Sequence, residues 1–358
     1  IRHYAGIVQK KFMLRSLIDA GDYVAELGMG TSDEDIEDIL DDAEKKILSV
    51  VSSPKSQKFV AIKDSLPEAC ERLEKLHENK GELRGVPTGF PHLDSILSGL
   101  QNSDLIILAA RPSMGKTTLA LDIARLAATK HNIPVGIFSL EMSSQQLVDR
   151  MLSAESQVNA WNLRTGNLTA DSEFTKIRDS LDRLAKAPIY IDDQPGNSIM
   201  RMKSTARKLK LEHGLGMIIV DYLQLMTTSK NYDSMVNQVT EISRSLKSLA
   251  KELNVPVLAL SQLSRAVESR GGRPRLSDLR DSGSIEQDAD VVMFIHREDK
   301  YKDQSEKTNI AEILIEKHRN GPTGKVDLFF DEKKTTFLSL EKSSLDDFAP
   351  APADFGEF

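Results

Sequence analysis

The spacing of apolar residues along the chain changes near residue 85. In residues 1 to 50 apolar side chains recur every three or four positions, as at Leu14 and Leu17, which is the period of a helix with one apolar face. The stretch from Ser32 to Asp35 has the form of a capping box and is predicted to open a second helix. We therefore expect the chain to begin with a helical segment that is too small to be a complete domain.

A segment rich in Ser and Pro, residues 51 to 64, follows and is predicted to be a linker. Residues 65 to 80 are then predicted to form a short amphipathic helix, with Leu66, Leu73 and Leu76 on one side. An apolar stripe on a helix between two linkers has to be buried, either by its own domain or by a neighbouring subunit.

Beyond residue 85, short apolar runs alternate with segments of helix length. This order is typical of a sheet built from βαβ units, so we expect an α/β domain with a mostly parallel central sheet. The predicted strands are Leu105 to Ala110, Val135 to Leu140, Ile189 to Asp192, Met217 to Asp221, Val255 to Ser261, Asp290 to His296 and Ile310 to Glu316.

Composition narrows the class of protein. The formal net charge of -7 excludes a surface that is basic all over, so any nucleic-acid binding must come from local basic loops. Cys70 is the only cysteine, which fits a reducing compartment such as the cytoplasm. No apolar run approaches the ~20 residues of a membrane helix, and the histidines lack metal-ligand spacing, so neither a membrane span nor a zinc site is expected.

The residues that carry chemistry begin with the stretch AARPSMGKTT, from Ala109 to Thr118. It matches the phosphate-binding pattern G-x-x-x-x-G-K-[ST], except that Ala110 replaces the first glycine, which is tolerated where φ is negative. The stretch follows a predicted strand and precedes a predicted helix, as a phosphate-binding loop must. Backbone N–H groups around Ser113 to Thr117 would face phosphates, Lys116 would reach the β- and γ-phosphates, and Thr117 would bind Mg²⁺.

Three further polar residues stand at the ends of predicted strands, where open α/β sheets bind their ligands. Asp221 could bind Mg²⁺ or serve only as a turn or cap residue. Glu141 could be the general base for an attacking water, or a carboxylate placed near a helix N-terminus. Gln262 could sense the γ-phosphate, although a polar residue at a strand end is weak evidence by itself.

Two groups of cations remain. The stretch from Arg265 to Gly283 is basic, rich in Gly and Pro, and lacks aromatics, which suits contacts to a nucleic-acid backbone but equally a solvated loop. Lys317 and Arg319 close the last predicted strand. They could act on a phosphate held by the next subunit, or discourage edge-to-edge aggregation.

Taken in order, these motifs resemble the replicative DNA helicases of the DnaB family, which carry a RecA-like motor domain. The resemblance covers nearly the whole chain, and in this family alanine at the position of Ala110 is part of the pattern. The stretch SDLRDSGSIEQDAD is the most specific, because general RecA-like ATPases lack it. The other matching stretches are GVPTGFPHLDSILSGLQNSDLIILAARPSMGKTT, FSLEMSSQQL, IIVDYLQLM, ALSQLSRAVE and EKHRNGPTG.

The resemblance implies a role for each site residue. ATP and Mg²⁺ would be held by Ser113, Met114, Gly115, Lys116, Thr117, Thr118 and Asp221, with Thr117 and Asp221 on the metal. Glu141 would be the catalytic base and Gln262 the γ-phosphate sensor, while Lys317 and Arg319 would act on the neighbour's ATP. Single-stranded DNA would be met by Arg280, Asp281 and Gly283.

The resemblance also implies an organisation and a set of partners. The protein would be a homohexameric ring that moves 5′ to 3′ on single-stranded DNA, unwinds forked DNA, meets primase and a helicase loader, and works in the cytoplasm at replication forks. Because the chain begins at Ile1 and not Met, we expect the front of the N-terminal domain to be missing. The expected parts are an N-terminal helical fragment that faces primase (1–50), a linker with its helix (51–84), the motor (85–342) and a disordered acidic tail (343–358).

Two alternatives share the same core. A strand-exchange recombinase or circadian-type ATPase would form filaments or stable double rings without separating strands. An ATP-gated scaffold that recruits primase or a loader would need no catalytic base. The stretch SDLRDSGSIEQDAD argues against the first, and the presence of both Glu141 and Asp221 argues against the second.

Overall fold

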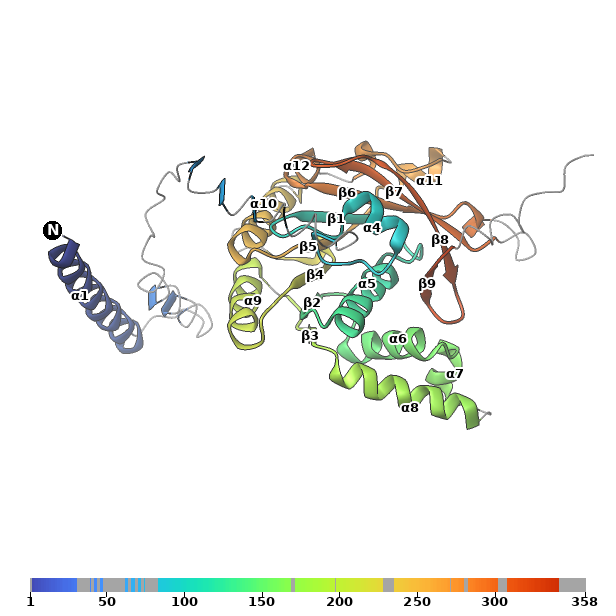
Figure 1. Cartoon of the computed structure of the whole chain (residues 1–358), viewed down its shortest axis with the longest axis horizontal. Helices are drawn as coiled ribbons and strands as arrows, with labels where there is room; N and C mark the ends of the chain where they lie inside the picture. The colour runs from blue at the N-terminus through green and yellow to red at the C-terminus, as the bar shows by residue number, and fades with distance from the viewer. Residues whose placement is uncertain are drawn as a thin grey trace, which may run out of the picture. The chain divides into compact units, whose positions relative to one another are not determined.

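The computed structural model divides into two compact units, Ile1–Lys80 and Gly81–Phe358, which are described separately (Figure 1). The residues that it describes are 2–30, 83–168, 171–196, 198–227, 235–270, 272–279, 283–301 and 308–340, with isolated positions between 39 and 74.

The first unit contains the long helix α1, Arg2–Met29. Ala20 is buried, while Phe12 and Ile18 are more than half exposed at 61% and 62%. The predicted helix at the start of the chain is therefore present. The capping box at Ser32 to Asp35 lies outside the described residues, as does most of the helix predicted over 65 to 80, so both stay predictions.

The second unit is built on one sheet, which has nine strands in the part of the chain that the structure describes. Its order is β3-β2-β4-β5-β1-β6-β7-β8-β9, parallel from β3 to β6 and antiparallel from β6 to β9. The mostly parallel α/β sheet predicted from the sequence is confirmed. The strands are β1 Leu105–Ala110, β2 Val135–Ser139, β3 Ile189–Asp192, β4 Met217–Asp221, β5 Val257–Gln262, β6 Val291–His296, β7 Ile310–His318, β8 Gly324–Asp331 and β9 Thr336–Ser339.

Helices cover both faces of this sheet (Figure 1). On β1, Ile106 and Leu108 belong to the core cluster that includes α5, whereas Leu105 and Ile107 belong to the cluster that includes α9 and α10. Because alternate residues of a strand point to opposite faces, the unbroken apolar run of β1 fills both cores. The helices are α4 Pro91–Leu97, α5 Lys116–His131, α6 Ser144–Ser156, α7 Ala160–Thr165, α8 Asp171–Lys186, α9 Ile199–His213, α10 Met235–Leu253, α11 Ala266–Arg270 and α12 Gly283–Asp288.

The structure corrects the predicted strands at several of their ends and in their number. β5 extends to Gln262, so this residue ends the strand and does not follow it, and β7 continues to His318. The hairpin of β8 and β9 was not predicted at all, and it extends the sheet beyond β7. Within the described residues, no helix is both long enough and apolar enough to cross a membrane.

Candidate active site

The loop between β1 and α5 has the backbone of a phosphate-binding loop. Ser113 and Gly115 have positive φ angles of 64° and 99°. A Cβ atom on Gly115 would lie 2.7 Å from Cζ of Phe337, so both the backbone and the space demand glycine. Ala110 is the last residue of the extended strand β1, so the departure from the glycine pattern costs no backbone strain.

Lys116 and Thr117, in the first turn of α5, both reach Asp221 at the carboxyl end of β4. Thr117 Oγ1 donates to Asp221 Oδ2 at 2.6 Å, and Lys116 Nζ lies 3.3 Å from Asp221 Oδ1. That Oδ1 atom is buried and accepts no well-oriented hydrogen bond from the described residues. A buried carboxylate oxygen of this kind has spare capacity for a cation, since a carboxylate accepts at two oxygens.

A cavity of about 430 Å³ opens in front of this pair at the carboxyl ends of the strands. It brings together most of the residues that the sequence marked. Its lining includes Ser113, Gly115, Lys116, Thr117, Thr118, Glu141 and Gln262. Met114 differs from them: its side chain is buried in the core, and its N–H donates to the carbonyl of Arg111 at 3.3 Å.

Glu141 is exposed at the cavity and stands two residues before the N-cap of α6. That helix end is already capped, because the Ser143 side chain accepts from the N–H of Gln146 and the Gln146 side chain accepts in return from the N–H of Ser143. The cap of α6 is therefore supplied by Ser143 and Gln146, and Glu141 lies near this helix N-terminus with its carboxylate at the cavity.

Gln262 pairs in register with Ala110 across β5 and β1. Its N–H donates to Gln224 Oε1 at 3.4 Å, and its carbonyl accepts from Gln224 Nε2 at 3.3 Å. These two bonds hold the main chain at the strand end, while the residue lines the cavity.

Sequence reasoning gave no role to several other residues of the cavity. Arg150 projects from α6, Tyr222 follows β4, and Phe330 and Thr335 come from the β8–β9 hairpin. Lys116 Nζ lies 4.1 Å from the centroid of the Tyr222 ring. Tyr222 directly follows Asp221 in the chain, and this position could have identified it as a residue of the site. Only the assembled fold places the other three residues at the cavity.

The cavity is electrostatically mixed. Burial lowers the pKa of Lys116 and of Arg150, and in both cases the carboxylates of Asp221 and Glu141 oppose that shift. Burial and the same two carboxylates raise the pKa of Tyr222. Two cations next to two anions in a poorly solvated cavity suit a bound polyanion that carries its own metal ion.

Lys317 and Arg319 are not part of this cavity. His318, between them, pairs with Val291, the first residue of β6, so both cations lie near the amino ends of the parallel strands, opposite the cavity. Lys317 Nζ donates to the carbonyls of Glu286 and Ala289 at the end of α12. Arg319 Nη1 lies 3.3 Å from Asp290 Oδ1, and its side chain is 57% exposed.

Of the predicted DNA contacts, Arg280 and Asp281 lie outside the described residues, and Gly283 is the first residue of α12. This short helix is tied to α10, where Thr240 Oγ1 donates to Ser284 Oγ at 2.8 Å. In the basic stretch before it, Arg270 and Arg273 make ion pairs with Asp278 and Glu312.

Comparison with known proteins identifies the family of the chain. The family model described as "DnaB-like helicase C terminal domain" matches residues 85–339. The chain is 49% identical over 344 residues to "Replicative DNA helicase DnaC" of Bacillus subtilis (strain 168), covering 96% of this chain and 75% of that relative. It is 51% identical over 344 residues to "Replicative DNA helicase DnaB" of Geobacillus stearothermophilus, with the same coverage.

Solved structures give the same result. One that is described as an "ATPase Domain" aligns with a TM-score of 0.75 at 38% identity, over 79% of this chain and 100% of that one. "The Structure Of A DnaB-Like Replicative Helicase And Its Interactions With Primase" aligns with a TM-score of 0.79 at 34% identity, over 95% of this chain and 79% of that one. The RecA-like fold class predicted from the sequence is therefore confirmed.

Proposed function

The chain belongs to the DnaB family of replicative DNA helicases, and we propose that it drives unwinding with Mg-ATP bound in the cavity between the phosphate-binding loop and Glu141. It is an enzyme that couples nucleotide hydrolysis to the unwinding of DNA in replication. Neither the recombinase nor the scaffold alternative is favoured by any observation, since the helicase family model spans the whole sheet up to residue 339.

The observation that carries the proposal is the meeting of Lys116, Thr117 and Asp221. A magnesium ion would be held by Thr117 Oγ1 and the Asp221 carboxylate, and the spare accepting capacity of the buried Asp221 Oδ1 fits that demand. Bound there with the nucleotide, the ion would neutralise phosphate charge and orient the γ-phosphate. Lys116 would leave Asp221 to reach the β- and γ-phosphates, while backbone N–H groups from Ser113 to Thr118 hold the phosphate chain.

Glu141 would take the proton of the attacking water, because it is a carboxylate that faces the cavity without capping a helix or pairing with the loop. Gln262, the last residue of β5, would sense the γ-phosphate. Arg150, on α6 and facing the same cavity, would add positive charge as the γ-phosphate departs.

Lys317 and Arg319 would complete the site of a neighbouring subunit. They lie at the opposite end of the parallel strands from the cavity of their own chain, so an action on ATP requires another copy. In a closed ring, each cavity could face the end of β7 in the next subunit, and the same contact would repeat around the ring. We propose that this ring is a homohexamer, as expected for the family.

DNA would pass through such a ring against Arg280, Asp281 and Gly283, which would contact the backbone of one strand. We propose movement 5′ to 3′, as expected for the family. Residues 1–50 would face primase, since the similar helicase structure named above is described together with its interactions with primase. Residues 51–84 would join them to the motor of 85–342, which an acidic tail over 343–358 follows. A helicase loader would place the ring on DNA. The protein would work in the cytoplasm, at replication forks associated with the nucleoid.

The test is strand displacement with Mg-ATP on two forked DNAs, one with a 5′ and one with a 3′ loading tail, at a stated salt concentration. Unwinding from the 5′ tail alone supports the proposal and its polarity. Unwinding from the 3′ tail alone contradicts the polarity. ATP hydrolysis without unwinding from either tail contradicts coupling in this chain.

A further inference from the structure

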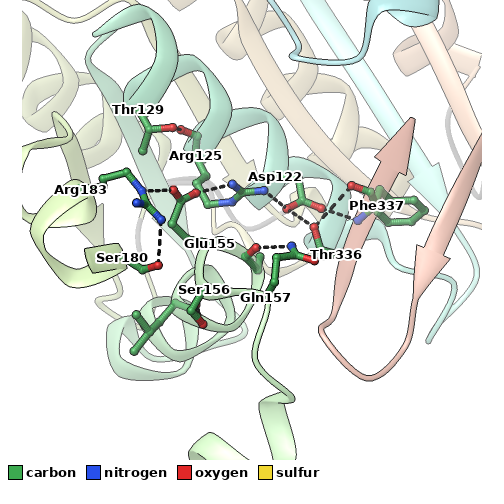
Figure 2. A network of polar contacts seen from close by, with 12 residues as sticks. Asp122, Arg125, Thr129, Glu155, Ser156, Gln157, Ser180, Arg183, Thr336 and Phe337 are labelled. Atoms are coloured by element: carbon green, nitrogen blue, oxygen red, sulfur yellow. Dashed lines mark hydrogen bonds and ion pairs between the residues drawn. The ribbon is translucent and has the colours of Figure 1, made fainter. Parts of the chain in front are cut away.

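A buried carboxylate on α5 lies outside the phosphate-binding residues. Asp122 is 2% exposed. Its Oδ1 accepts from Arg125 Nη2 at 3.0 Å and from Thr336 Oγ1 at 2.9 Å, and its Oδ2 accepts from the N–H of Phe337 at 2.7 Å (Figure 2). Asp122 therefore ties the helix that starts at the phosphate-binding loop to the first residues of β9.

The charge of Asp122 is balanced within the same network. Arg125 also donates to Glu155 of α6 at 2.6 Å, and Glu155 accepts from Arg183 of α8 at 2.6 Å (Figure 2). Burial raises the pKa of Asp122, and the Arg125 guanidinium and the Phe337 N–H oppose that shift. A buried ion network adds little net stability after the cost of desolvation. The role of this network is therefore to fix the position of β9 relative to α5.

The hairpin held by Asp122 reaches the nucleotide cavity. The Phe337 ring packs against Gly115, where no Cβ would fit, and its centroid lies 4.7 Å from that of Phe330. Phe330 and Thr335 line the cavity itself. Thr335 Oγ1 is buried and has no hydrogen-bond partner among the described residues, which is unusual for a hydroxyl unless a ligand supplies one.

The turn between the two strands is held from other sides as well. The carbonyl of Lys333 accepts from the N–H of Ala160 at 2.9 Å, and that of Lys334 accepts from Ser153 Oγ at 3.1 Å. Arg297 donates to Glu332 at 2.8 Å and lies 4.4 Å from the Phe330 ring centroid. The position of Thr335 is thus set by several fixed contacts, and Asp122 supplies those that come from the phosphate-binding helix.

We propose that Asp122 is a positioning residue of the nucleotide site: by holding Thr336 and Phe337 it sets the β8–β9 turn so that Thr335 faces the nucleoside end of the bound nucleotide. This rests on the proposed function. Lys116, Thr117 and Asp221 mark the phosphate end of the cavity. The hairpin contributes a hydroxyl and an aromatic ring instead, which suit a sugar and a base and not a phosphate.

The experiment compares Thr336→Val and Thr335→Val with the unaltered full chain. Valine keeps the β-branched shape, and in Thr336→Val it removes only the hydroxyl that donates to Asp122, leaving the Asp122–Arg125 ion pair. Thr336→Ser restores a hydroxyl. The matched control is Thr129→Val on α5, the helix of Asp122. The Thr129 hydroxyl donates to the carbonyl of Arg125 away from the cavity (Figure 2).

Binding of Mg-ADP and of Mg-pyrophosphate is measured for each variant, together with kcat and KM for ATP. Losing one hydrogen bond should weaken Mg-ADP about fivefold to tenfold and raise KM by a similar factor, with kcat within about twofold of the parent. Mg-pyrophosphate, which reaches only the phosphate end, should bind Thr336→Val, Thr335→Val and the parent equally. Thr336→Ser and Thr129→Val should behave as the parent for both ligands.

Three outcomes would overturn the proposal. Equal weakening of both ligands would mean that the hairpin supports the phosphate-binding loop and not the nucleoside end. Unchanged Mg-ADP binding in both valine variants would remove the hairpin from nucleotide recognition. Failure of the unaltered chain to bind Mg-ADP would refute the proposed function itself, and it differs from the other outcomes because the parent fails together with its variants.

Discussion

Thr117 Oγ1 and Asp221 Oδ2 lie 2.6 Å apart, although 104 positions separate these residues in the chain. The contact exists because β4 and β1 both flank β5 in a parallel sheet, so their carboxyl ends meet at one side of the domain. The helix that follows β1 starts there and presents its first turn to the end of β4. Two weak motifs thereby become one site with a hydroxyl, an amine and a carboxylate.

Removing the charge of Asp221 should abolish metal-dependent turnover. In Asp221→Asn the amide replaces one carboxylate oxygen, so we expect kcat for ATP to fall on the order of 10²-fold to 10³-fold. Steady-state hydrolysis over a range of Mg²⁺ concentrations measures this. Asp193→Asn, a change at a partly buried carboxylate that accepts from the N–H of Ser144, is the control and should retain kcat. Retained turnover in Asp221→Asn would refute the metal role.

Glu141→Gln should separate nucleotide binding from hydrolysis. The amide has the shape of the carboxylate but takes no proton, so kcat should fall about 10²-fold to 10⁴-fold. Binding of Mg-ATP, measured by equilibrium titration, should stay within about threefold, because Glu141 is exposed at the cavity and holds no other residue of the loop. Normal hydrolysis by this variant would exclude Glu141 as the base.

The sequence predicted well that the marked residues of the loop and of the strand ends lie together, because each of them stands at the end of a strand or in a spaced motif. Lys116, Thr117, Glu141 and Asp221 are found where the strand pattern placed them. In a parallel sheet the ends of strands converge, so position along the chain predicts position in space. The roles of Asp221 and Glu141 stay predictions, which the Asp221→Asn and Glu141→Gln variants test.

The cavity residues on α6 and on the β8–β9 hairpin could not be predicted in this way. Arg150 sits in the middle of α6, and its orientation depends on how that helix packs on α5 and α8. Thr335 reaches the cavity only because β8 and β9 fold back beyond β7, and the alternating pattern of β8 gives no indication of its partner. Tertiary packing, and not local pattern, places these side chains.

The action of Arg319 in a neighbouring subunit can be tested by mixing two inactive variants. If Glu141 and Arg319 serve the same site from different chains, an equal mixture of Glu141→Gln and Arg319→Ala subunits contains some interfaces with both native residues. Random assembly makes these about a quarter of all interfaces, so ATP hydrolysis should recover to about that fraction of the unaltered protein. The measurement is hydrolysis per subunit after the variants are mixed and exchanged.

Absence of recovery in a mixture shown to exchange subunits would refute the action in trans, since every chain would then lack one residue of its own site. The control is Arg319→Ala alone, taken through the same mixing procedure, which should stay inactive. An Arg319→Lys variant tests whether charge alone suffices, because lysine lacks the planar guanidinium.

Asp104 provides a stability prediction that does not depend on the nucleotide cavity of its own chain. It directly precedes β1 at the amino ends of the parallel strands, and burial together with the charge of Asp290 raises its pKa from 3.8 to about 6. A carboxyl whose pKa is raised on folding binds more protons in the folded state than in the unfolded state. Between about pH 4 and pH 6 its contribution to stability therefore falls as pH rises, and above that window the loss is complete.

Asp104→Asn should consequently stabilise the protein at pH 7.5 by about 1–3 kcal/mol, because the pKa of about 6 already includes the opposing attraction of Lys247. The gain should shrink as the pH is lowered through 6 and vanish below about pH 3, where the native carboxyl is largely protonated in both the folded and the unfolded state. Urea unfolding at a series of pH values measures the difference. A gain that is constant across this range would show that the variant acts through packing and not through the charge of Asp104.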